Sequence, residues 1–543
     1  MRIAKSLTAA LCLVSGAVAF DPREATIAST HHDLYTGLVT CREVVESFLA
    51  RIEALNNHTN AILALNPNAL RDADDCDRAL VSKNGTRGAL FGIPILLKDN
   101  FDTSFMPTTG ANIAMELSQP TVDAPSVAAF KRAGAIILGK ANLHELALEG
   151  ISVSSLGGQT INPYDSTRTP GGSSGGTGAA IAASFAVWGT GTDTVNSLRS
   201  PASANSLWSM RPTRGLISRA GVIPISYTQD TIGPIARCVE DVATAITVMA
   251  SIGYDADDNT TASVPAGIQG TDYAASITTG SLKGLRLGLL EGFFNRTSSN
   301  ESTPVNDAMA KHVAKLRGAG ATIVPVNETI YDANAIIAAL DVQRYEYREL
   351  LTEYLERPEV AGTHPNSTNE LYAGDDFLVL PSGYEYVTTS LVSSTSNATY
   401  NSTLAGIRDL SLALEKTFVS NGLDALIYPE QKNLVVKIGS PSQVGRNGIL
   451  AALTGTPVVT VPIGFSPATE TAPDGVPIGM EILGRQWTEE KLFQIAYQMQ
   501  QLGRARKMPS WAKQQVHAKQ YDAVPKVTPN VGNIPEEYPL GVL

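Results

Sequence analysis

Short apolar runs and amphipathic segments alternate along most of the chain. Thr40 and Glu43 form a T-x-x-E capping box ahead of 44–55, whose apolar residues recur at helical spacing, and a second, more polar helix is expected around 67–80. From Gly88 onward, apolar runs typical of buried strands alternate with amphipathic helices. This alternation predicts an α/β fold in which a central, twisted, parallel or mixed sheet is sandwiched between helices. The segments that carry it begin at Gly88, Pro125, Gly284, Asp307, Leu410, Thr454, Pro477 and Glu489.

Changes in this pattern divide the chain into three predicted parts. Residues 1–19 are expected to be a secretory signal, 20–83 an N-terminal helical arm packed on the core, and 84–543 the α/β/α domain. An aromatic helix followed by a Ser/Thr/Asn-rich stretch predicts an insertion at about 341–403 over one face. Such insertions commonly shape access to a substrate site, and a plain surface excursion is the alternative.

The first twenty residues have the pattern of an export signal. Arg2 and Lys5 precede an apolar run, and Ala17 and Ala19 give the small-x-small pattern that predicts cleavage after Ala19. A membrane anchor is the alternative, but the apolar run is too short to span a bilayer, and no other stretch is long enough. Export and N-glycosylation are also predicted by nine N-x-[ST] sequons, at Asn57, Asn84, Asn259, Asn295, Asn300, Asn327, Asn366, Asn397 and Asn401.

Composition excludes some classes of partner. The formal net charge is −11 and no basic cluster interrupts it, so nucleic acid would be repelled. The histidines and cysteines lack metal-ligand spacing, which argues against a metal site.

Removing the signal leaves three cysteines. Cys41 and Cys76 both lie in the N-terminal helical region, and a disulfide between them would leave Cys238 as a buried thiol. The alternative is that all three are small, buried apolar residues.

The stretch from Thr169 to Arg199 is the most unusual in the chain. It contains a glycine-serine turn, a helix of small residues and a second polar loop that carries Ser197. Gly171 to Gly175 matches G-x-S-x-G, the nucleophile elbow of α/β-hydrolases, with Ser173 as its serine. That turn does not follow an apolar strand, and a Walker-type phosphate loop would need a lysine that is missing. A plain tight turn before a helix is the further alternative. An elbow also needs a histidine base, and the candidates lie in a helix, a loop and a tail without a suitable setting: His312, His364 and His517.

Several strings around this stretch occur together. Lys98 ends the apolar run GIPILLKDN, and Ser173 and Ser197 follow twenty-four positions apart in NPYDSTRTPGGSSGG and GTDTVNSLRSPASAN. With RPTRGLISRAGVIPISYTQDTIGP, these strings resemble the amidase signature family over nearly all of the chain after the signal, and the last one is similar to bacterial peptide amidases.

The resemblance implies a Ser-cisSer-Lys triad. Ser197 would attack an amide carbonyl and form an acyl-enzyme. Lys98 would be the base, which requires burial to lower the pKa of its ammonium group. Ser173, held through a cis peptide from Gly172, would pass the proton between them.

The family also implies an oxyanion site next to the nucleophile. It would use backbone amides at Thr194, Val195, Asn196 and Ser197, while the side chains of Ser174, Asp193 and Arg199 would fix the loops. The family usually has glycine at one or both positions before the nucleophile, where this chain has Val195 and Asn196. Val195 must then keep ordinary dihedral angles, and both side chains are expected to narrow the space near the acyl carbon and alter substrate scope.

The sequence therefore predicts a secreted amidase that acts without metal or organic cofactor on the amide of a small molecule or short peptide. An esterase or acyltransferase with the same triad is the first alternative. A secreted binding protein on a catalytically inactive amidase fold is the second. The sequence carries no signal for an oligomeric state.

Overall fold

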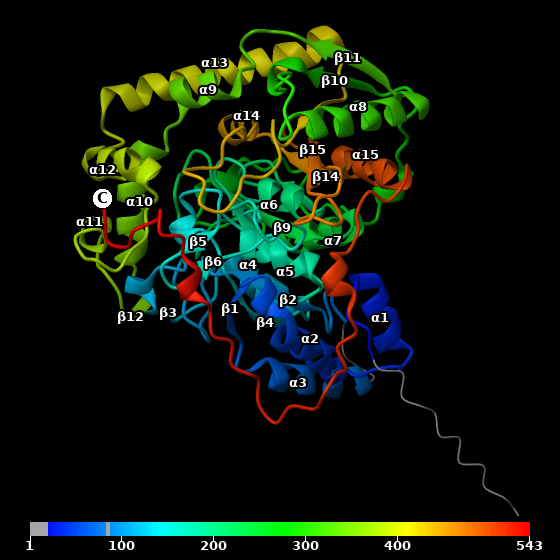
Figure 1. Ribbon diagram of the computed structural model, residues 1–543, viewed down its shortest axis with the longest axis vertical. Coiled ribbons are helices and arrows are strands. Elements are labelled where there is room, and N and C mark those ends of the chain that lie inside the picture. Colours follow the sequence, from blue (N-terminus) through cyan, green and yellow to red (C-terminus); the bar gives the residue numbers. More distant parts are fainter. Residues whose placement is uncertain (1–19, 83–86) are drawn as a thin grey trace, which may run out of the picture.

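One large sheet organises the molecule (Figure 1). In this computed structural model, which describes residues 20–82 and 87–543, the sheet has eleven strands in the order β1-β4-β2-β7-β9-β8-β14-β15-β13-β10-β11. Their bounds are β1 Ile62–Leu65, β2 Pro94–Lys98, β4 Ile136–Ala141, β7 Trp188–Asp193, β8 Trp208–Arg211, β9 Thr231–Ala236, β10 Arg286–Leu290, β11 Thr322–Val326, β13 Ala425–Pro429, β14 Val458–Phe465 and β15 Pro477–Leu483.

The sheet is mixed. Strands β4, β2 and β7 run parallel to one another, as do β13, β10 and β11, whereas the other neighbouring pairs are antiparallel. The helices that cover it are α1 Ile27–Tyr35, α2 Cys41–Leu55, α3 Ala69–Val81, α4 Pro125–Arg132, α5 Gly175–Ala182, α6 Arg199–Ala204, α7 Val239–Ala250, α8 Thr303–Gly318, α9 Ala333–Leu340, α13 Ala398–Asn421, α14 Ile449–Thr454 and α15 Glu489–Gln501. The predicted α/β class, with a mixed sheet between helices, is confirmed.

Strand β7 lies where the sequence predicted only a polar loop. Its six residues are all buried between β2 and β9, so both neighbours complete its backbone hydrogen bonds despite its glycines and threonines. The small residues have a packing role, because a Cβ on Gly189 would come within 2.7 Å of Thr177 of α5. The glycines therefore let α5 lie directly against the strand that leads to Ser197.

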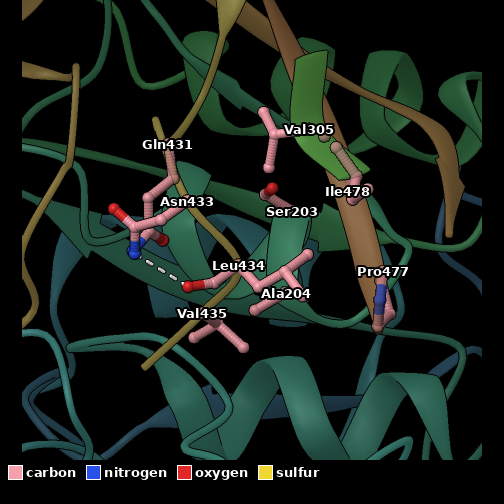
Figure 2. A pocket seen from close by; sticks show the side chains of 10 residues that line it. Ser203, Ala204, Val305, Gln431, Asn433, Leu434, Val435, Pro477 and Ile478 are labelled. Atoms are coloured by element: carbon pink, nitrogen blue, oxygen red, sulfur yellow. Dashed lines mark hydrogen bonds between the residues drawn. The ribbon is translucent and has the colours of Figure 1, made fainter. Parts of the chain in front are cut away.

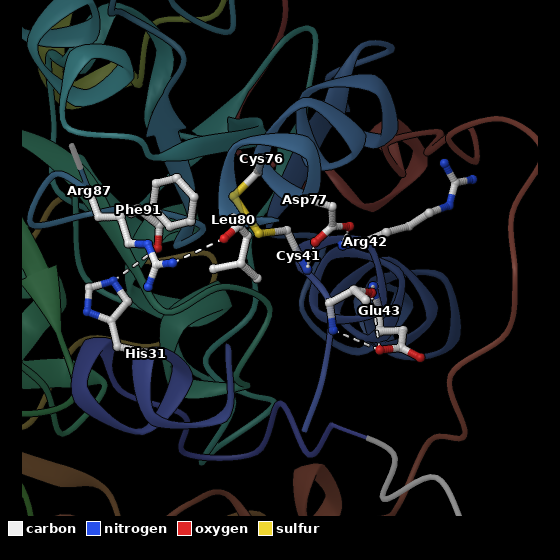
Figure 3. The surroundings of a disulfide bond; sticks show 10 residues. His31, Cys41, Arg42, Glu43, Cys76, Asp77, Leu80, Arg87 and Phe91 are labelled. Atoms are coloured by element: carbon white, nitrogen blue, oxygen red, sulfur yellow. Dashed lines mark hydrogen bonds between the residues drawn. A yellow bond between two sulfur atoms is a disulfide. The ribbon is translucent and has the colours of Figure 1, made fainter. Parts of the chain in front are cut away.

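The capping box predicted at the start of α2 is present. Thr40 N donates to Glu43 Oε2 over 2.8 Å, and Glu43 N donates to Thr40 Oγ1 over 3.1 Å. Asp77 of α3 adds a carboxylate at the same helix N-terminus, where it accepts from Cys41 N over 2.6 Å (Figure 3). The segment 20–83 also supplies β1, an edge strand that the sequence did not predict.

A disulfide joins α2 to α3. Cys41 and Cys76 have Cα atoms 6.1 Å apart and are bonded through their sulfur atoms (Figure 3). Cys238, at the N-cap of α7, is a free thiol, as one of the two sequence-based alternatives expected. Burial raises the pKa of this thiol well above its usual range.

Residues 341–403 build a separate group of elements at the side of the sheet (Figure 1). They contain α10 Gln343–Leu355, β12 Val360–Thr363, α11 Thr368–Leu371 and α12 Tyr384–Val392, and β12 pairs with β3 Leu117–Pro120. The chain after α15 passes the N-terminal helices and ends beside this group, where Leu540 bridges to Leu378 (Figure 1). A further short hairpin consists of β5 Val153–Ser154 and β6 Gly158–Gln159. Within the described ranges, no helix is long and apolar enough to cross a membrane.

Candidate active site

Lys98 is the last residue of β2, and its side chain is completely buried. Its Nζ donates hydrogen bonds of 2.7 Å to Ser173 Oγ and 2.7 Å to Thr192 Oγ1. Burial lowers the pKa of Lys98 to about 7, although Asp193 and Asp230 oppose this by favouring the charged form. An amine with this pKa can accept a proton at neutral pH while it remains bonded to a serine hydroxyl.

The loop that carries Ser173 is held by its backbone. The Gly172–Ser173 peptide is cis, and Gly171 has a φ of +70°, which favours glycine. His144 N donates to Ser173 O over 3.0 Å. A Cβ on Gly172 would lie 2.6 Å from Ser152 Oγ, so this position leaves no room for a side chain. Glycine is therefore needed for the close approach of the two loops.

The loop from Thr194 to Ser197 connects β7 to α6, and Asp193 fixes it. Leu198 N donates to Asp193 Oδ2 over 3.1 Å, and the same carboxylate is paired with Arg199 and with Arg211 at 3.0 and 2.8 Å. Burial raises the pKa of Asp193, but the two guanidinium groups outweigh it and hold the value at about 2. The carboxylate is therefore charged throughout the neutral range.

Arg199 extends this buried network to the far side of the loop. Its Nη1 pairs with Glu481 at 2.9 Å, and its Nη2 donates to Gly448 O over 3.0 Å and also to Val195 O. All of these charged side chains are fully buried. Each charge has an opposite partner, so the loop is held without an uncompensated ion.

Main-chain atoms join the loop that carries Ser173 to the loop that carries Ser197. Ser174 N donates to Ser197 O over 3.3 Å, and Ser174 Oγ lies 3.4 Å from both Thr192 N and Thr192 O. Among the described residues, Ser197 Oγ has no hydrogen-bond partner, so its hydroxyl is not bonded to Ser173 Oγ in this conformation. Lys98 and Ser173 are thus joined by their side chains, and Ser197 is joined to the same loop by its backbone.

The two residues before Ser197 have different roles, which corrects the expectation that both narrow the acyl site. Asn196 is 1 % exposed, its Nδ2 donates to Glu430 Oε1 over 3.2 Å, and it lines neither of the two cavities that border the loop. Val195 is half-buried and lines a cavity, and it keeps an ordinary backbone conformation as predicted. The polar Asn196 side chain is directed inward because a buried carboxylate is available to accept its hydrogen bond.

Two cavities border this loop. The smaller has a volume of about 230 Å³ and is lined by His144, Val195 and residues of the 341–403 group. The larger, about 770 Å³, is lined by Thr192, Thr194, Asp230 and other residues of the same group, among them Tyr354 and Arg357. A third pocket beside Ser203 and Gln431 has a volume of only about 10 Å³ (Figure 2), so it admits at most one water molecule.

Two residues that were not predicted as part of the site hold the loop from Thr194 to Ser197. Thr194 Oγ1 donates to Asp230 Oδ1 over 2.6 Å, and Gln229 Nε2 donates to Thr194 O over 3.3 Å. Both residues lie in the TQDTIGP string that carried the resemblance, so that string was the available signal. Their contact with Thr194 arises because β9 pairs with β7.

The histidines do not supply a base for a nucleophile elbow at Ser173. The Ser173 hydroxyl is bonded to Lys98, while His364 contacts the carbonyl oxygens of Val360 and Pro365. His312 lies within α8 and its Nε2 is buried without a partner. In the part of the chain that the structure describes, no group of three or more His, Cys, Asp or Glu side chains is arranged to hold a metal ion.

The family model Amidase matches residues 43–493. The chain belongs to the amidase family. It is 32 % identical over 487 residues to the glutamyl-tRNA(Gln) amidotransferase subunit of Acinetobacter baumannii (strain AYE), covering 85 % of this chain and 92 % of that protein. It is 32 % identical over 507 residues to a probable amidase of Arabidopsis thaliana, covering 91 % and 92 %.

Solved structures show the same family relationship. The peptide amidase of Stenotrophomonas maltophilia superimposes with a TM-score of 0.77 at 31 % identity, covering 90 % of this chain and 98 % of that one. As a member of the amidase family, the chain is a hydrolase of amide carbon–nitrogen bonds. The amidase signature fold predicted from the sequence is confirmed.

Proposed function

We propose that this amidase uses Ser197 as nucleophile, Ser173 as proton relay and Lys98 as base to cleave the amide of a small molecule or short peptide. The observation that carries the proposal is the hydrogen bond of 2.7 Å from Lys98 Nζ to Ser173 Oγ. The desolvated site, which lowers the pKa of Lys98 to about 7, supports it, because a lysine in water would stay protonated. The likeness to a peptide amidase supports a short peptide amide as one substrate.

The proposed reaction begins when neutral Lys98 takes the Ser173 hydroxyl proton while Ser173 takes that of Ser197. This step needs the Ser197 side chain to turn toward Ser173, and the backbone bond from Ser174 N to Ser197 O keeps the two loops close enough. Ser197 Oγ then bonds to the carbonyl carbon, whose π electrons move to the oxygen. Collapse breaks the C–N bond, and the proton returns through Ser173 to the leaving nitrogen. Water releases the acyl group by the same steps.

Backbone N–H groups are available for the oxyanion. The amides of Thr194, Val195, Asn196 and Ser197 donate no hydrogen bond to any described residue. Gln229 and Arg199 hold the carbonyl oxygens of Thr194 and Val195, and Asp193 holds Arg199 and the N–H of Leu198, which restricts the direction of the donors. Preorganised donors of this kind stabilise the charge that develops in the transition state.

The function is tested by ammonia release from primary amides of short acyl chains and peptides. The wild-type protein is expected to release ammonia, and Ser197→Ala and Ser173→Ala to be inactive. Parallel assays test the alternatives on the same enzyme. The rate of hydrolysis of matched esters measures esterase activity, and the rate of acyl transfer to hydroxylamine measures acyltransferase activity. A correctly folded wild-type protein that turns over none of these substrates would instead favour the binding-protein alternative.

We also propose that the enzyme is exported and N-glycosylated. Eight of the nine sequon asparagines are exposed in the structure, and Asn84 and the predicted signal at 1–19 lie outside the described residues. The disulfide between Cys41 and Cys76 fits an oxidising compartment. Mass spectrometry of the protein recovered from the medium of a eukaryotic host is expected to give an N-terminus at Phe20 and a mass that falls on enzymatic deglycosylation. An intracellular, unmodified product would contradict export.

A further inference from the structure

The cavity of about 230 Å³ contains polar groups that the proposed mechanism does not use. They come from the loop after β4, from the 341–403 group and from Arg446. They lie beside the loop from Thr194 to Ser197, here called the nucleophile loop, because Val195 lines the same cavity. The wall also contains apolar residues, among them Ile337, Leu378 and Leu380. The volume is below the roughly 300 Å³ at which pockets for drug-sized ligands begin, so it fits a compact acyl group.

His144 presents a neutral donor to this cavity. Val153 N lies 3.4 Å from His144 Nδ1, and a backbone N–H can only donate, so Nδ1 is the acceptor and the ring proton is on Nε2. The bond from Val153 N to Nδ1 is the only hydrogen bond of the His144 ring among the described residues, so Nε2 is left for a ligand. Burial lowers the pKa of His144 to about 4, which keeps the ring uncharged at neutral pH. The backbone N–H of His144 donates to the backbone oxygen of Ser173, and this bond places the His144 ring next to Ser173, the proposed proton relay.

Asp341 presents a carboxylate to the same cavity. Gln343 orients it, since its backbone N and Nε2 donate to Asp341 Oδ1 over 3.1 and 2.9 Å. The next residue, Val342, donates its N–H to Gln229 Oε1 over 3.3 Å, and Gln229 also holds Thr194 O. The main chain next to Asp341 is therefore tied to the nucleophile loop through the buried Gln229 side chain.

The charges of the cavity are unbalanced. Arg446 is paired with Glu149 at 3.1 Å, whereas Asp341 has no ion-pair partner within the described ranges. With His144 neutral, the lining has the acidic side chains of Glu149 and Asp341 and one guanidinium. Burial raises the pKa of Asp341, while the hydrogen bonds from Gln343 and the charges of Arg446 and Arg344 favour its ionised form. The Tyr386 hydroxyl, also at this cavity, is buried without a hydrogen-bond partner, which is costly unless a ligand supplies one.

We propose that His144 and Asp341 select the acyl group of the substrate. The preferred acyl group is a compact, largely apolar chain that carries an acceptor for His144 Nε2–H and a neutral or cationic donor for Asp341. Amides of acidic chains are excluded. The inference rests on the proposed function, because it requires an acyl group on Ser197. A cationic chain balances the excess negative charge, while an anionic chain would bring a third acidic group into a cavity whose Arg446 already pairs with Glu149.

The test uses three primary amides of equal chain length that end in an ammonium, a methyl or a carboxylate group. For the wild type, kcat/KM is expected to be at least about tenfold higher for the ammonium and methyl amides than for the carboxylate amide. Asp341→Asn keeps an oxygen for Gln343 but removes the charge, and should reduce the ammonium-to-carboxylate ratio about tenfold or more. Glu356→Gln is the matched control, because this exposed acid of the same group lies outside the cavity.

His144 is tested separately with two variants. His144→Gln retains a neutral N–H donor and should keep KM for the methyl amide within about threefold of the wild type, whereas His144→Phe fills the space without a donor and should raise KM about tenfold or more. Each variant is first labelled with a small fluorophosphonate, which reports an intact Ser197 independently of acyl selection.

The outcomes separate the two proposals. Labelled, active enzyme in which Asp341→Asn leaves the ratio unchanged, or in which His144→Phe leaves KM unchanged, would overturn the selection proposal. Wild-type protein that is neither labelled nor active would overturn the proposed function on which it rests.

Discussion

Lys98 Nζ and Ser173 Oγ lie 2.7 Å apart at the buried end of β2. Thr192 of the neighbouring strand β7 accepts a second hydrogen bond from the same amine. Both hydrogen-bond partners of Lys98 are therefore uncharged, and neither supplies a negative charge that would stabilise its ammonium form. Burial then outweighs the more distant charges of Asp193 and Asp230. The fold therefore holds the pKa of Lys98 near neutrality, as the proposed role of base requires.

This relationship predicts the pH dependence of the reaction. Only neutral Lys98 can accept a proton, and its pKa is about 7, so kcat/KM should rise about tenfold per pH unit below pH 7 and level off above it. Lys98→Ala should lower the rate near neutral pH by on the order of 10²- to 10⁴-fold, and least at high pH, where hydroxide substitutes for the base. A wild-type profile that falls with rising pH through 7 would remove Lys98 from this role.

Asp193 is predicted to be the main support of the nucleophile loop. Asp193→Asn would leave the buried Arg199 and Arg211 without their shared anion and is expected to cost about 3–5 kcal/mol in the free energy of unfolding. Asp21→Asn is the matched control, because the Asp21–Arg23 pair is exposed and should contribute about 1 kcal/mol or less. Urea unfolding measures both, and equal effects for the two variants would refute the role given to Asp193.

Substitutions at the two residues before Ser197 are predicted to have different effects, one on substrate specificity and the other on stability. Val195→Gly should widen the smaller cavity and change the relative kcat/KM for long and short acyl chains. Asn196→Gly should leave that preference unchanged but cost about 1–3 kcal/mol in unfolding, since Glu430 loses its hydrogen bond inside the protein. A changed acyl preference in Asn196→Gly would show that its side chain reaches the substrate after all.

The disulfide is predicted to stabilise the N-terminal helices. It closes a loop between positions 35 residues apart, for which loop-closure entropy gives about 4 kcal/mol. Replacing Cys41 and Cys76 together by alanine should lower the denaturation midpoint, and reductant should have the same effect on the wild type. Cys238→Ser serves as control and should change the midpoint little. A wild type insensitive to reductant would argue against the bond.

Much of the fold follows from local sequence. The apolar run before Lys98 predicted a buried strand with a polar end, and the structure has β2 there. Strand β7 was missed because its glycines and threonines have no apolar pattern and are buried only by strands from elsewhere in the chain. Strand β1 was missed for a related reason, since it is a four-residue edge strand between helices.

The site was predictable where a motif carried it and not where distant segments meet. Lys98, Ser173 and Ser197 lie in strings with a recognisable spacing. The partner of Asn196, Glu430, is more than two hundred positions away, and Asp341 is similarly distant from His144. No local pattern predicts such pairs, because the sheet order and the position of the 341–403 group bring them together.

The most direct test of the central claim is the mass spectrometric location of a covalent fluorophosphonate adduct on the wild-type protein. The proposed triad predicts one adduct, on Ser197, that forms faster as the pH rises through about 7 and is absent from Ser197→Ala. An adduct on Ser173 that persists in Ser197→Ala, or an unmodified Ser197 in folded protein, would contradict the assignment of the nucleophile.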